Sequence, residues 1–279
     1  MVSQREKAEF FRGLHHGKHP MVLPNAWDVP SARMFENCGF PVVATSSAGV
    51  MVSLGYPDGE VIGRDEYLAA VRRITKVISI PLSVDIVGGF GNTAGEVSST
   101  IERVISIGAI GINIEDFVPA TKKLDPMEKQ VGKLEAIKSQ AASSDIPLVI
   151  NARTDALRYA EGDDEAKLHE AIRRASAYRD AGADCVYPMG LTNREAISTF
   201  VRALECPVNV MIRKGLPSLA ELEELGVARV SFGPDASYAA MGLLKKISRE
   251  ILENGSFVSL LEDAISFDEL NSLAEPAEK

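Results

Sequence analysis

The chain has 279 residues, of which 46% are hydrophobic and 25% charged, and it carries a net charge of −9. This length fits one large α/β domain better than two. The acidic balance argues against a nucleic-acid partner, which requires a basic face. No apolar run approaches the ~20 residues that a membrane span needs. With three isolated cysteines and no signal-peptide core, the sequence predicts a cytoplasmic protein with reduced thiols.

Short β-rich segments alternate with amphipathic segments of helical length from residue 21 to about 254, and glycine or proline marks most junctions. The predicted strands are Met21–Pro24, Val42–Ser46, Leu82–Ile86, Gly111–Glu115, Leu148–Ala152, Cys185–Pro188, Val208–Met211 and Arg229–Phe232. The helices between them include Arg64–Val77, Ala94–Ile107, Glu165–Ala181 and Ser218–Leu225. Strict alternation predicts an α/β fold, a (β/α)8 TIM barrel with a parallel eight-stranded core. A doubly wound sheet is the alternative, but no Gly-rich dinucleotide turn follows the first strand.

Two terminal segments lie outside these repeated units. Glu6–His15 is predicted to form a helix with Phe10, Phe11 and Leu14 on one face, able to cover the bottom of the barrel. We assign residues 1–255 to a catalytic barrel domain and residues 256–279 to a C-terminal helical extension. The extension is too apolar for a solvated tail, so it needs a partner surface, either its own barrel or another subunit.

Acidic residues stand where predicted strands end. Asp85 ends the third strand and Glu115 the fourth, and active sites of parallel barrels lie at these strand ends. A carboxylate in a Val/Ile-rich strand costs free energy unless it is paired or bound to a metal. Oxygen ligands without His or Cys suit Mg²⁺ or Mn²⁺. A helix cap or surface ion pair is the structural alternative, and for Asp116 it is preferred, because adjacent strand residues point to opposite faces. Asp58 follows the second strand in a Pro-Asp-Gly turn, where a plain turn residue is the competing interpretation.

A possible anion site is indicated by Arg153 at the end of the fifth strand. A buried guanidinium requires an anion, which either Asp155 or a substrate carboxylate can supply. The second strand ends in hydroxyl groups that can serve a carboxylate or phosphate, or simply form a turn. These residues are Thr45, Ser46 and Ser47. Asn209 on the seventh strand could donate to the same ligand.

These segments resemble the isocitrate lyase/phosphoenolpyruvate mutase superfamily over roughly residues 5–255. The resemblance rests on Leu23-Pro24-Asn25-Ala26-Trp27-Asp28, Thr45-Ser46-Ser47, the Asp85 strand with Gly88-Gly89-Phe90-Gly91, Asn113-Ile114-Glu115-Asp116 and Asn151-Ala152-Arg153-Thr154-Asp155. It implies Mg²⁺ (or Mn²⁺) chemistry on small 2-oxo or 2-hydroxy acids through an enolate or enolpyruvate. By position, it implies that Asp85 is the direct metal ligand and that Asp58 and Glu115 hold metal-bound waters. It also implies a substrate-carboxylate site made by Ser46, Ser47 and Arg153.

The sequence departs from the family pattern at two places. Family metal sites usually carry a second acid two residues after the Asp85 position, where this chain has Val87. The loop after the fourth strand, residues 120–126, lacks the Lys-Lys/Arg-Cys-Gly-His motif of isocitrate and methylisocitrate lyases. It also lacks the asparagine-containing stretch of the phosphonopyruvate-forming mutases. Lys122 in this loop joins Asp58 and Arg153 as a candidate catalytic residue.

The resemblance therefore favours a Mg²⁺-dependent carbon–carbon lyase or decarboxylase that acts on an oxaloacetate-like carboxylate through an enolate. One alternative is a phosphoenolpyruvate/phosphonopyruvate mutase or a phosphonopyruvate hydrolase. Another is a barrel that binds a keto acid without catalysis. The resemblance also implies a homodimer or homotetramer, because members of the superfamily commonly exchange their last helices between subunits.

Overall fold

A computed structural model describes residues 2–276 and contains a closed barrel of parallel strands, as predicted. The barrel strands are β1 (Met21–Leu23), β2 (Asn25–Ala26), β3 (Val43–Thr45), β4 (Leu82–Asp85), β5 (Gly111–Glu115), β8 (Val149–Thr154), β9 (Cys185–Pro188), β10 (Asn209–Met211) and β11 (Arg229–Ser231). β1 and β2 are two halves of the first barrel strand on either side of Pro24. β1 pairs with β11, β2 pairs with β3, and a bridge between Val186 and Val208 joins β9 to the β10 side. The barrel is thereby closed.

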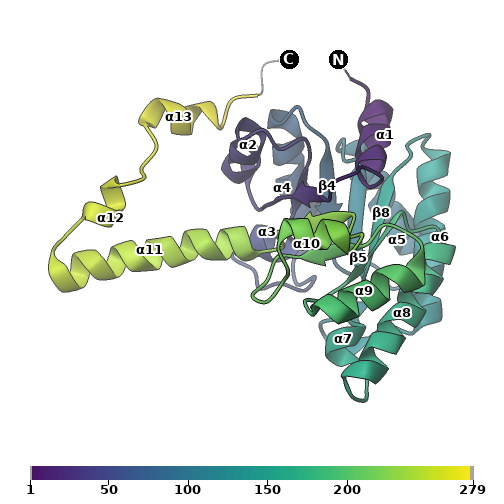
Figure 1. Cartoon of the computed structure of the whole chain (residues 1–279). Coiled ribbons are helices and arrows are strands. Elements are labelled where there is room, and N and C mark those ends of the chain that lie inside the picture. Colours follow the sequence, from purple (N-terminus) through teal and green to yellow (C-terminus); the bar gives the residue numbers. More distant parts are fainter. Residues whose placement is uncertain (1, 277–279) are drawn as a thin grey trace.

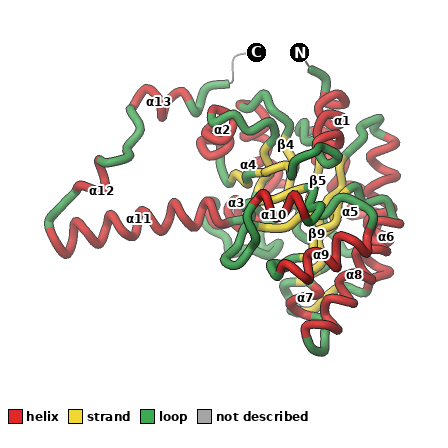
Figure 2. The backbone as a smooth tube through the Cα atoms, viewed as in Figure 1, coloured by secondary structure: helices red, strands yellow, loops and turns green. Residues whose placement is uncertain are grey.

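Helices surround the strands, as Figures 1 and 2 show. The outer helices are α2 (Val29–Asn37), α4 (Arg64–Val77), α5 (Ala94–Ser106), α6 (Met127–Ser143), α8 (Asp164–Asp180), α9 (Arg194–Leu204) and α10 (Leu219–Glu224). Two short helices, α3 (Ser47–Ser53) and α7 (Ala156–Tyr159), follow β3 and β8. A hairpin of β6 (Phe117–Val118) and β7 (Lys123–Leu124) follows β5. The predicted range of α4 coincides with the observed one, and the other predicted helices differ by one or two residues at one or both ends.

Local sequence explains where these helices begin and end. Thr93 and Glu96 form a reciprocal capping box at the start of α5, which satisfies backbone N–H groups that have no partner within the helix. Gly108, Gly182 and Gly226 follow the ends of α5, α8 and α10 with φ of 91°, 100° and 78°. Glycine adopts this left-handed conformation without steric cost, so each helix stops there and the chain turns into the next strand.

The N-terminal helix α1 (Gln4–Leu14) covers the end of the barrel opposite the strand carboxyl ends. Phe11 is fully buried and its ring lies 4.9 Å from that of His15, edge to face. Phe10 is 49% exposed, so the prediction that both phenylalanines face the barrel was wrong. Adjacent residues on a helix are about 100° apart, and only one of them can face the core.

The C-terminal helices leave the barrel (Figure 1). This C-terminal arm, residues 235–276, consists of α11 (Asp235–Asn254), α12 (Val258–Leu261) and α13 (Phe267–Ser272). α11 stands where the eighth barrel helix is expected, yet Ser237 is its one buried residue. Exposed apolar side chains on the arm are Tyr238, Met241, Leu243, Leu244, Ile251, Leu252, Phe257, Val258, Leu260, Leu261, Ile265, Phe267 and Leu270.

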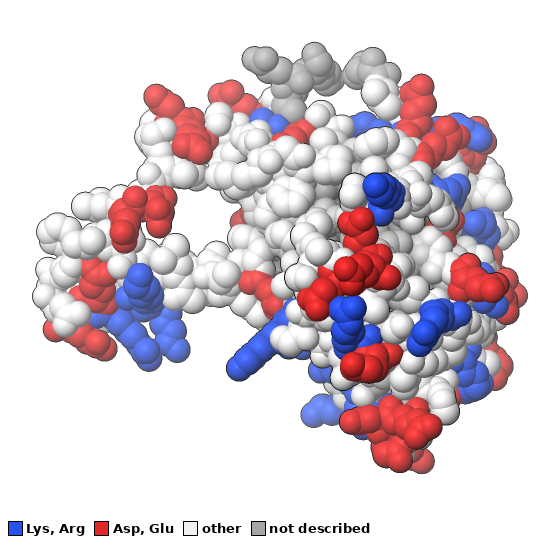
Figure 3. All heavy atoms as spheres, in the orientation of Figure 1, with Lys and Arg blue, Asp and Glu red and all other residues white. Residues whose placement is uncertain are grey.

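The barrel therefore does not cover most of the apolar surface of the predicted extension. Residues 277–279 of that extension lie outside the described residues. On the face drawn in Figure 3, acidic and basic side chains are interspersed over the barrel, whereas part of the arm carries neither. Within residues 2–276, no helix is both long enough and apolar enough to span a bilayer.

Candidate active site

A cavity of about 230 Å³ lies at the carboxyl ends of the barrel strands and extends into the barrel. Seven of the predicted site residues line it, and they come from barrel strands, from the start of α3 and from the loop after α3. They are Thr45, Ser46, Ser47, Asp58, Asp85, Arg153 and Asn209. Glu115 and Lys122 are absent from its wall. Most of the residues that the strand-end pattern predicted to be neighbours therefore lie around one cavity.

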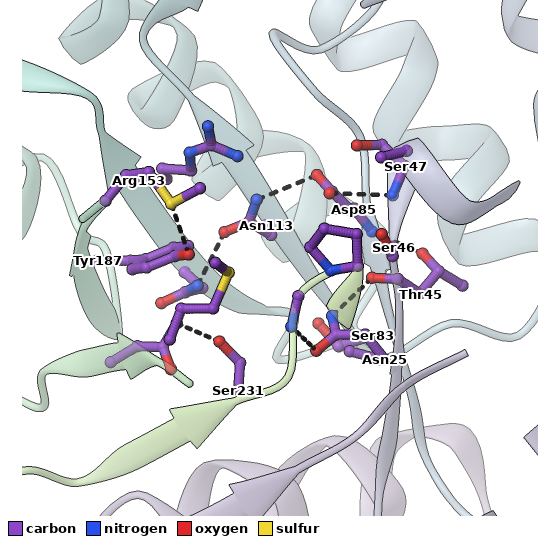
Figure 4. Close-up of a pocket in the computed structure, with 18 of the residues that line it drawn as sticks. Asn25, Thr45, Ser46, Ser47, Ser83, Asp85, Asn113, Arg153, Tyr187 and Ser231 are labelled. Atoms are coloured by element: carbon purple, nitrogen blue, oxygen red, sulfur yellow. Dashed lines mark hydrogen bonds between the residues drawn. The ribbon is translucent and has the colours of Figure 1, made fainter. Parts of the chain in front are cut away.

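Asp85 is held by three neighbouring elements (Figure 4). Its carboxylate accepts hydrogen bonds from the Asn113 amide at 3.0 Å, the Ser47 backbone N–H at 3.2 Å and the Val87 backbone N–H at 3.3 Å. Its own backbone N–H donates to Thr45 Oγ1 at 2.9 Å. Three donors on one carboxylate fix its orientation. Asp85 is therefore a preorganised anionic group on the cavity wall.

Asp58 brings a second carboxylate to the same cavity from the loop after α3. Although the residue is exposed, loss of hydration around the carboxyl raises its pKa, and the charge of Asp85 raises it further. Two carboxylates that repel each other across a polar cavity are the arrangement that a bound cation relieves.

Arg153 is fixed by two carboxylates. Its Nε and Nη2 donate to Asp155 at 2.6 and 3.1 Å, and its Nη1 lies 2.7 Å from Glu115 Oε2. Burial by itself would lower the pKa of the guanidinium, but the charges of Glu115 and Asp155 outweigh that effect and hold it well above its ordinary value. Asp155 does supply the protein counter-ion, as one interpretation of the sequence proposed. Arg153 nevertheless lines the cavity and has N–H groups left for a ligand.

Asp116 lies behind this arrangement and is fully buried. Its carboxylate accepts hydrogen bonds from the Asp155 backbone N–H at 2.9 Å, Thr154 Oγ1 at 2.8 Å, Tyr178 Oη at 2.7 Å and Arg174 Nη1 at 3.0 Å. The preference for a structural role is consistent with these contacts. The sequence did not identify Arg174, because a mid-helix arginine usually faces solvent.

The remaining predicted residues have distinct surroundings. The Ser46 hydroxyl accepts the Gly49 N–H at 3.3 Å and caps α3. The Asn209 amide donates to Ser231 Oγ at 3.1 Å from a fully buried position. Glu115 is buried against Arg153, and burial raises the pKa of its carboxyl while the charge of Arg153 opposes the rise. Lys122 lies exposed in the turn of the β6–β7 hairpin.

Val87 adopts a conformation that is rare for its side chain. It is 2% exposed and has φ of +52°, in the left-handed region, where a β-branched residue is an outlier. The loop that it begins is tied down, because Phe90 donates its backbone N–H to Glu60 at 2.8 Å and Lys133 donates to the Gly88 carbonyl at 2.9 Å. Contacts of this kind hold a strained backbone in place.

The donor chemistry of the cavity suits a hard divalent cation. Asp85 and Asp58 offer carboxylate oxygens on its wall. Within residues 2–276, no group of three or more His, Cys, Asp or Glu side chains is placed to hold one ion. Mg²⁺ commonly binds through one or two carboxylates and keeps several waters, so this set fits Mg²⁺ better than a metal that needs an all-protein cage.

Sequence reasoning missed several residues that line the cavity. They include Asn113, Asn151, Arg158, Tyr187, Arg213 and Arg229. Asn113 and Asn151 stand two residues before Glu115 and Arg153 on β5 and β8, so period-2 alternation places each on the same strand face as a predicted residue. Arg158 in α7 and Arg213 after β10 carry no such signal.

Replacing Asp58 tests the electrostatic account of the cavity. In metal-free buffer at pH 7.5, we expect Asp58→Asn to raise the melting temperature, because the folded state disfavours ionisation of this carboxyl. A raised pKa means that this penalty grows as the pH rises through the folded pKa, so the gain should vanish at lower pH. Mg²⁺ should stabilise the wild type more than Asp58→Asn. Thermal melts at several pH values with EDTA or Mg²⁺ measure both effects. A variant that melts below the wild type without metal contradicts this account.

Comparisons of the sequence and the structure with known proteins give results consistent with this geometry. A family model described as phosphoenolpyruvate phosphomutase matches residues 11–252. A 2-methylisocitrate lyase of Escherichia coli K12 is 33% identical over 251 residues, covering 86% of this chain and 82% of the relative. An oxaloacetate decarboxylase of Bradyrhizobium diazoefficiens is 31% identical over 211 residues, covering 73% of this chain and 70% of the relative. A solved structure from Burkholderia cenocepacia J2315, described as that of a candidate phosphonomutase, superposes with a TM-score of 0.84 at 37% identity, covering 88% of this chain and 99% of that one.

Proposed function

Because the chain belongs to the phosphoenolpyruvate mutase/isocitrate lyase superfamily, we propose that it is a divalent-metal-dependent carbon–carbon lyase or decarboxylase. The proposed substrate is a small, oxaloacetate-like 2-oxo or 2-hydroxy carboxylate. The observation that carries the proposal is the presence of Asp58, Asp85 and Arg153 on the wall of one cavity. That combination suits a ligand with an anionic group next to a polarisable oxygen.

Each of these residues has a task in the proposed reaction. Asp85, fixed by its three hydrogen bonds, would hold Mg²⁺ or Mn²⁺ directly, and Asp58 would hold it through water. When bound, the cation would polarise the 2-oxo group and stabilise negative charge that develops as the carbon–carbon bond breaks. Arg153 would orient the adjacent carboxylate through its free N–H groups, with Asp155 and Glu115 keeping its plane fixed. Glu115 and Lys122 stay predicted participants.

The chain should release pyruvate from oxaloacetate in the presence of Mg²⁺. Pyruvate can be followed with lactate dehydrogenase and NADH, with subtraction of the metal-catalysed background measured without enzyme. EDTA should abolish the enzyme-dependent rate, and Mg²⁺ should restore it. A rate equal to background at all metal concentrations argues against oxaloacetate as the substrate. The same assay on 2-methylisocitrate then tests the 2-hydroxy acid class.

A second candidate reaction is the rearrangement or hydrolysis of a phosphonate. The similarity to the Burkholderia structure favours it, and so does the lack of the lyase motif in residues 120–126. ³¹P NMR of phosphonopyruvate incubated with enzyme and Mg²⁺ separates the two chemistries. Loss or migration of the phosphonate signal has no explanation in lyase chemistry.

We also propose that the chain is a homo-oligomer whose C-terminal arm packs on a second copy. The arm exposes many apolar side chains, and Leu252 on α11 is 85% exposed. A soluble monomer rarely leaves so large an apolar surface in water. The proposed function does not depend on this assembly.

Leu252→Glu should weaken that assembly. If Leu252 lies at the centre of the interface, we expect the apparent dissociation constant to rise at least about 30-fold. Lys246→Gln on the same helix is the control, because it changes the net charge by the same single unit. Size-exclusion chromatography with light scattering, over a range of protein concentrations, measures the mass. A wild type that stays monomeric at all concentrations would exclude the proposed oligomer.

A further inference from the structure

The floor of the cavity contains a buried arginine without a counter-ion. Arg229 begins β11, lines the cavity and is 2% exposed. Its Nε and Nη1 make no hydrogen bond, and no ion pair includes it, within the part of the chain that the structure describes. A guanidinium stays protonated in proteins, and burying an unpaired charge is costly. A partner for this charge is therefore needed.

The nearby protein groups do not supply that partner. The Phe11 ring, with its centroid 5.9 Å from the Arg229 guanidinium carbon, offers only its π face. Burial, aided by the charge of Arg229, lowers the pKa of His15 to about 3, so this imidazole is neutral. Burial also raises the pKa of the Cys185 thiol to about 12. The negative charge of Asp85 favours the charged form of the guanidinium, but the Asp85 carboxylate is hydrogen-bonded to other groups, such as the Asn113 amide. Burial has the larger effect and lowers the pKa of Arg229.

Other polar atoms of the same floor are also without partners. Ser83 Oγ, Asn151 Oδ1 and Asn209 Oδ1 are buried, form no hydrogen bond within residues 2–276 and belong to residues that line the cavity. Strand register places Asn209 directly beside Arg229. Water can satisfy the two amide oxygens, since it donates hydrogen bonds. Water cannot compensate the charge of the guanidinium, whereas an anion can.

We propose that Arg229 is the centre of an internal site for one small anion, either a free halide or a carboxylate group of a bound ligand. The site lies in the barrel interior, apart from the carboxylate position assigned to Arg153. A carboxylate there would make Arg229 a specificity-determining residue for ligands with two anionic ends. A halide there would be a resident ion that compensates the buried charge. The inference does not require that the proposed reaction be correct.

Thermal melting of the full chain at constant ionic strength tests the site. We compare chloride and bromide with isethionate, whose charge is spread over a sulfonate group larger than a halide, in the wild type, Arg229→Met and the exposed control Arg72→Met. In halide, the wild type and the control should melt about 3 °C higher than in isethionate. Arg229→Met should melt at one temperature in all three salts. If Arg229→Met fails to fold, the halide response of the wild type alone decides.

Malonate and acetate distinguish the two sources of the anion. If a ligand carboxylate occupies the site, malonate should stabilise the wild type and halide should compete with it. Arg229→Met should then reduce the affinity for malonate at least about tenfold more than the affinity for acetate. If a resident halide occupies the site, halide should stabilise the protein equally with and without malonate. Melting that responds to neither halide nor malonate at constant ionic strength overturns the proposal.

Discussion

Asp85→Asn should lower metal-dependent turnover of oxaloacetate by roughly a thousandfold or more. Asp85 is the best-oriented carboxylate of the cavity, with donors from Ser47, Asn113 and Val87 around it. An asparagine retains the size of the side chain but loses the charge, and it turns an N–H group toward donors that need an acceptor. Stabilisation by Mg²⁺ should be lost in parallel with activity.

The matched control for this prediction is Glu135→Gln, the same acid-to-amide change at an exposed position of α6. It should keep wild-type turnover and the wild-type response to Mg²⁺. Removal of the Asp85 charge should also lower the pKa of Asp58, because that charge contributes to its rise. Pyruvate formation at the wild-type rate in Asp85→Asn would falsify the assignment of this residue as the metal ligand. Loss of activity with a loss of folding would not, so melting curves accompany each assay.

Asp116→Ala should cause the largest loss of stability among the predicted changes. The substitution leaves the buried Arg174 charge, the Tyr178 hydroxyl and the Asp155 backbone N–H without their shared acceptor. Breaking a buried pair by removing one partner costs about 3–5 kcal/mol. For a chain of this size, that corresponds to a fall of roughly 10 °C in melting temperature.

Asp180→Ala provides a matched control, because it removes an aspartate that pairs with Arg179 at the surface, with a side chain 67% exposed. Exposed pairs contribute about 0–1 kcal/mol, so this variant should melt near the wild type. Chemical denaturation gives the free energy of unfolding for both variants. Equal losses in the two would mean that the Asp116 network does not stabilise the barrel as its geometry indicates. If Asp116→Ala folds, it should also bind carboxylates weakly, since Asp155 orients Arg153.

The sequence predicted the barrel well because its signals are local and repeated. Strand β5 and helix α4 have the predicted bounds, since apolar runs and helical periodicity depend on a few adjacent residues. Because active sites of parallel barrels lie at the carboxyl ends of the strands, the sequence also predicted that Asp58, Asp85 and Arg153 share one site, and all three line one cavity. Contacts made across the fold were harder to predict. Arg174 reaches Asp116 from the middle of α8, and Arg229 begins a strand as an unpaired charge, and neither has a motif that marks its role.

Two roles predicted from family position stay predictions. Lys122 was predicted as catalytic from its loop, and that loop forms an exposed hairpin turn. Glu115 was predicted to hold a metal-bound water, but its side chain faces Arg153. Sequence position identifies the strand end that carries a residue. It does not identify which neighbour the side chain contacts, because several charged groups compete for it.

The division of the first barrel strand at Pro24 has a consequence for how the chain folds during synthesis. β1 must wait for β11, because residues 21 and 229 are direct partners, whereas β2 finds β3 early. Closing so long a loop is entropically costly, and folds dominated by such distant pairs form slowly. Until residues 229–231 have left the ribosome, the incomplete sheet has two unpaired edge strands, β1 and β10. Unpaired edges are sites of intermolecular pairing. Chains that end before residue 229 should therefore aggregate rather than form a smaller barrel.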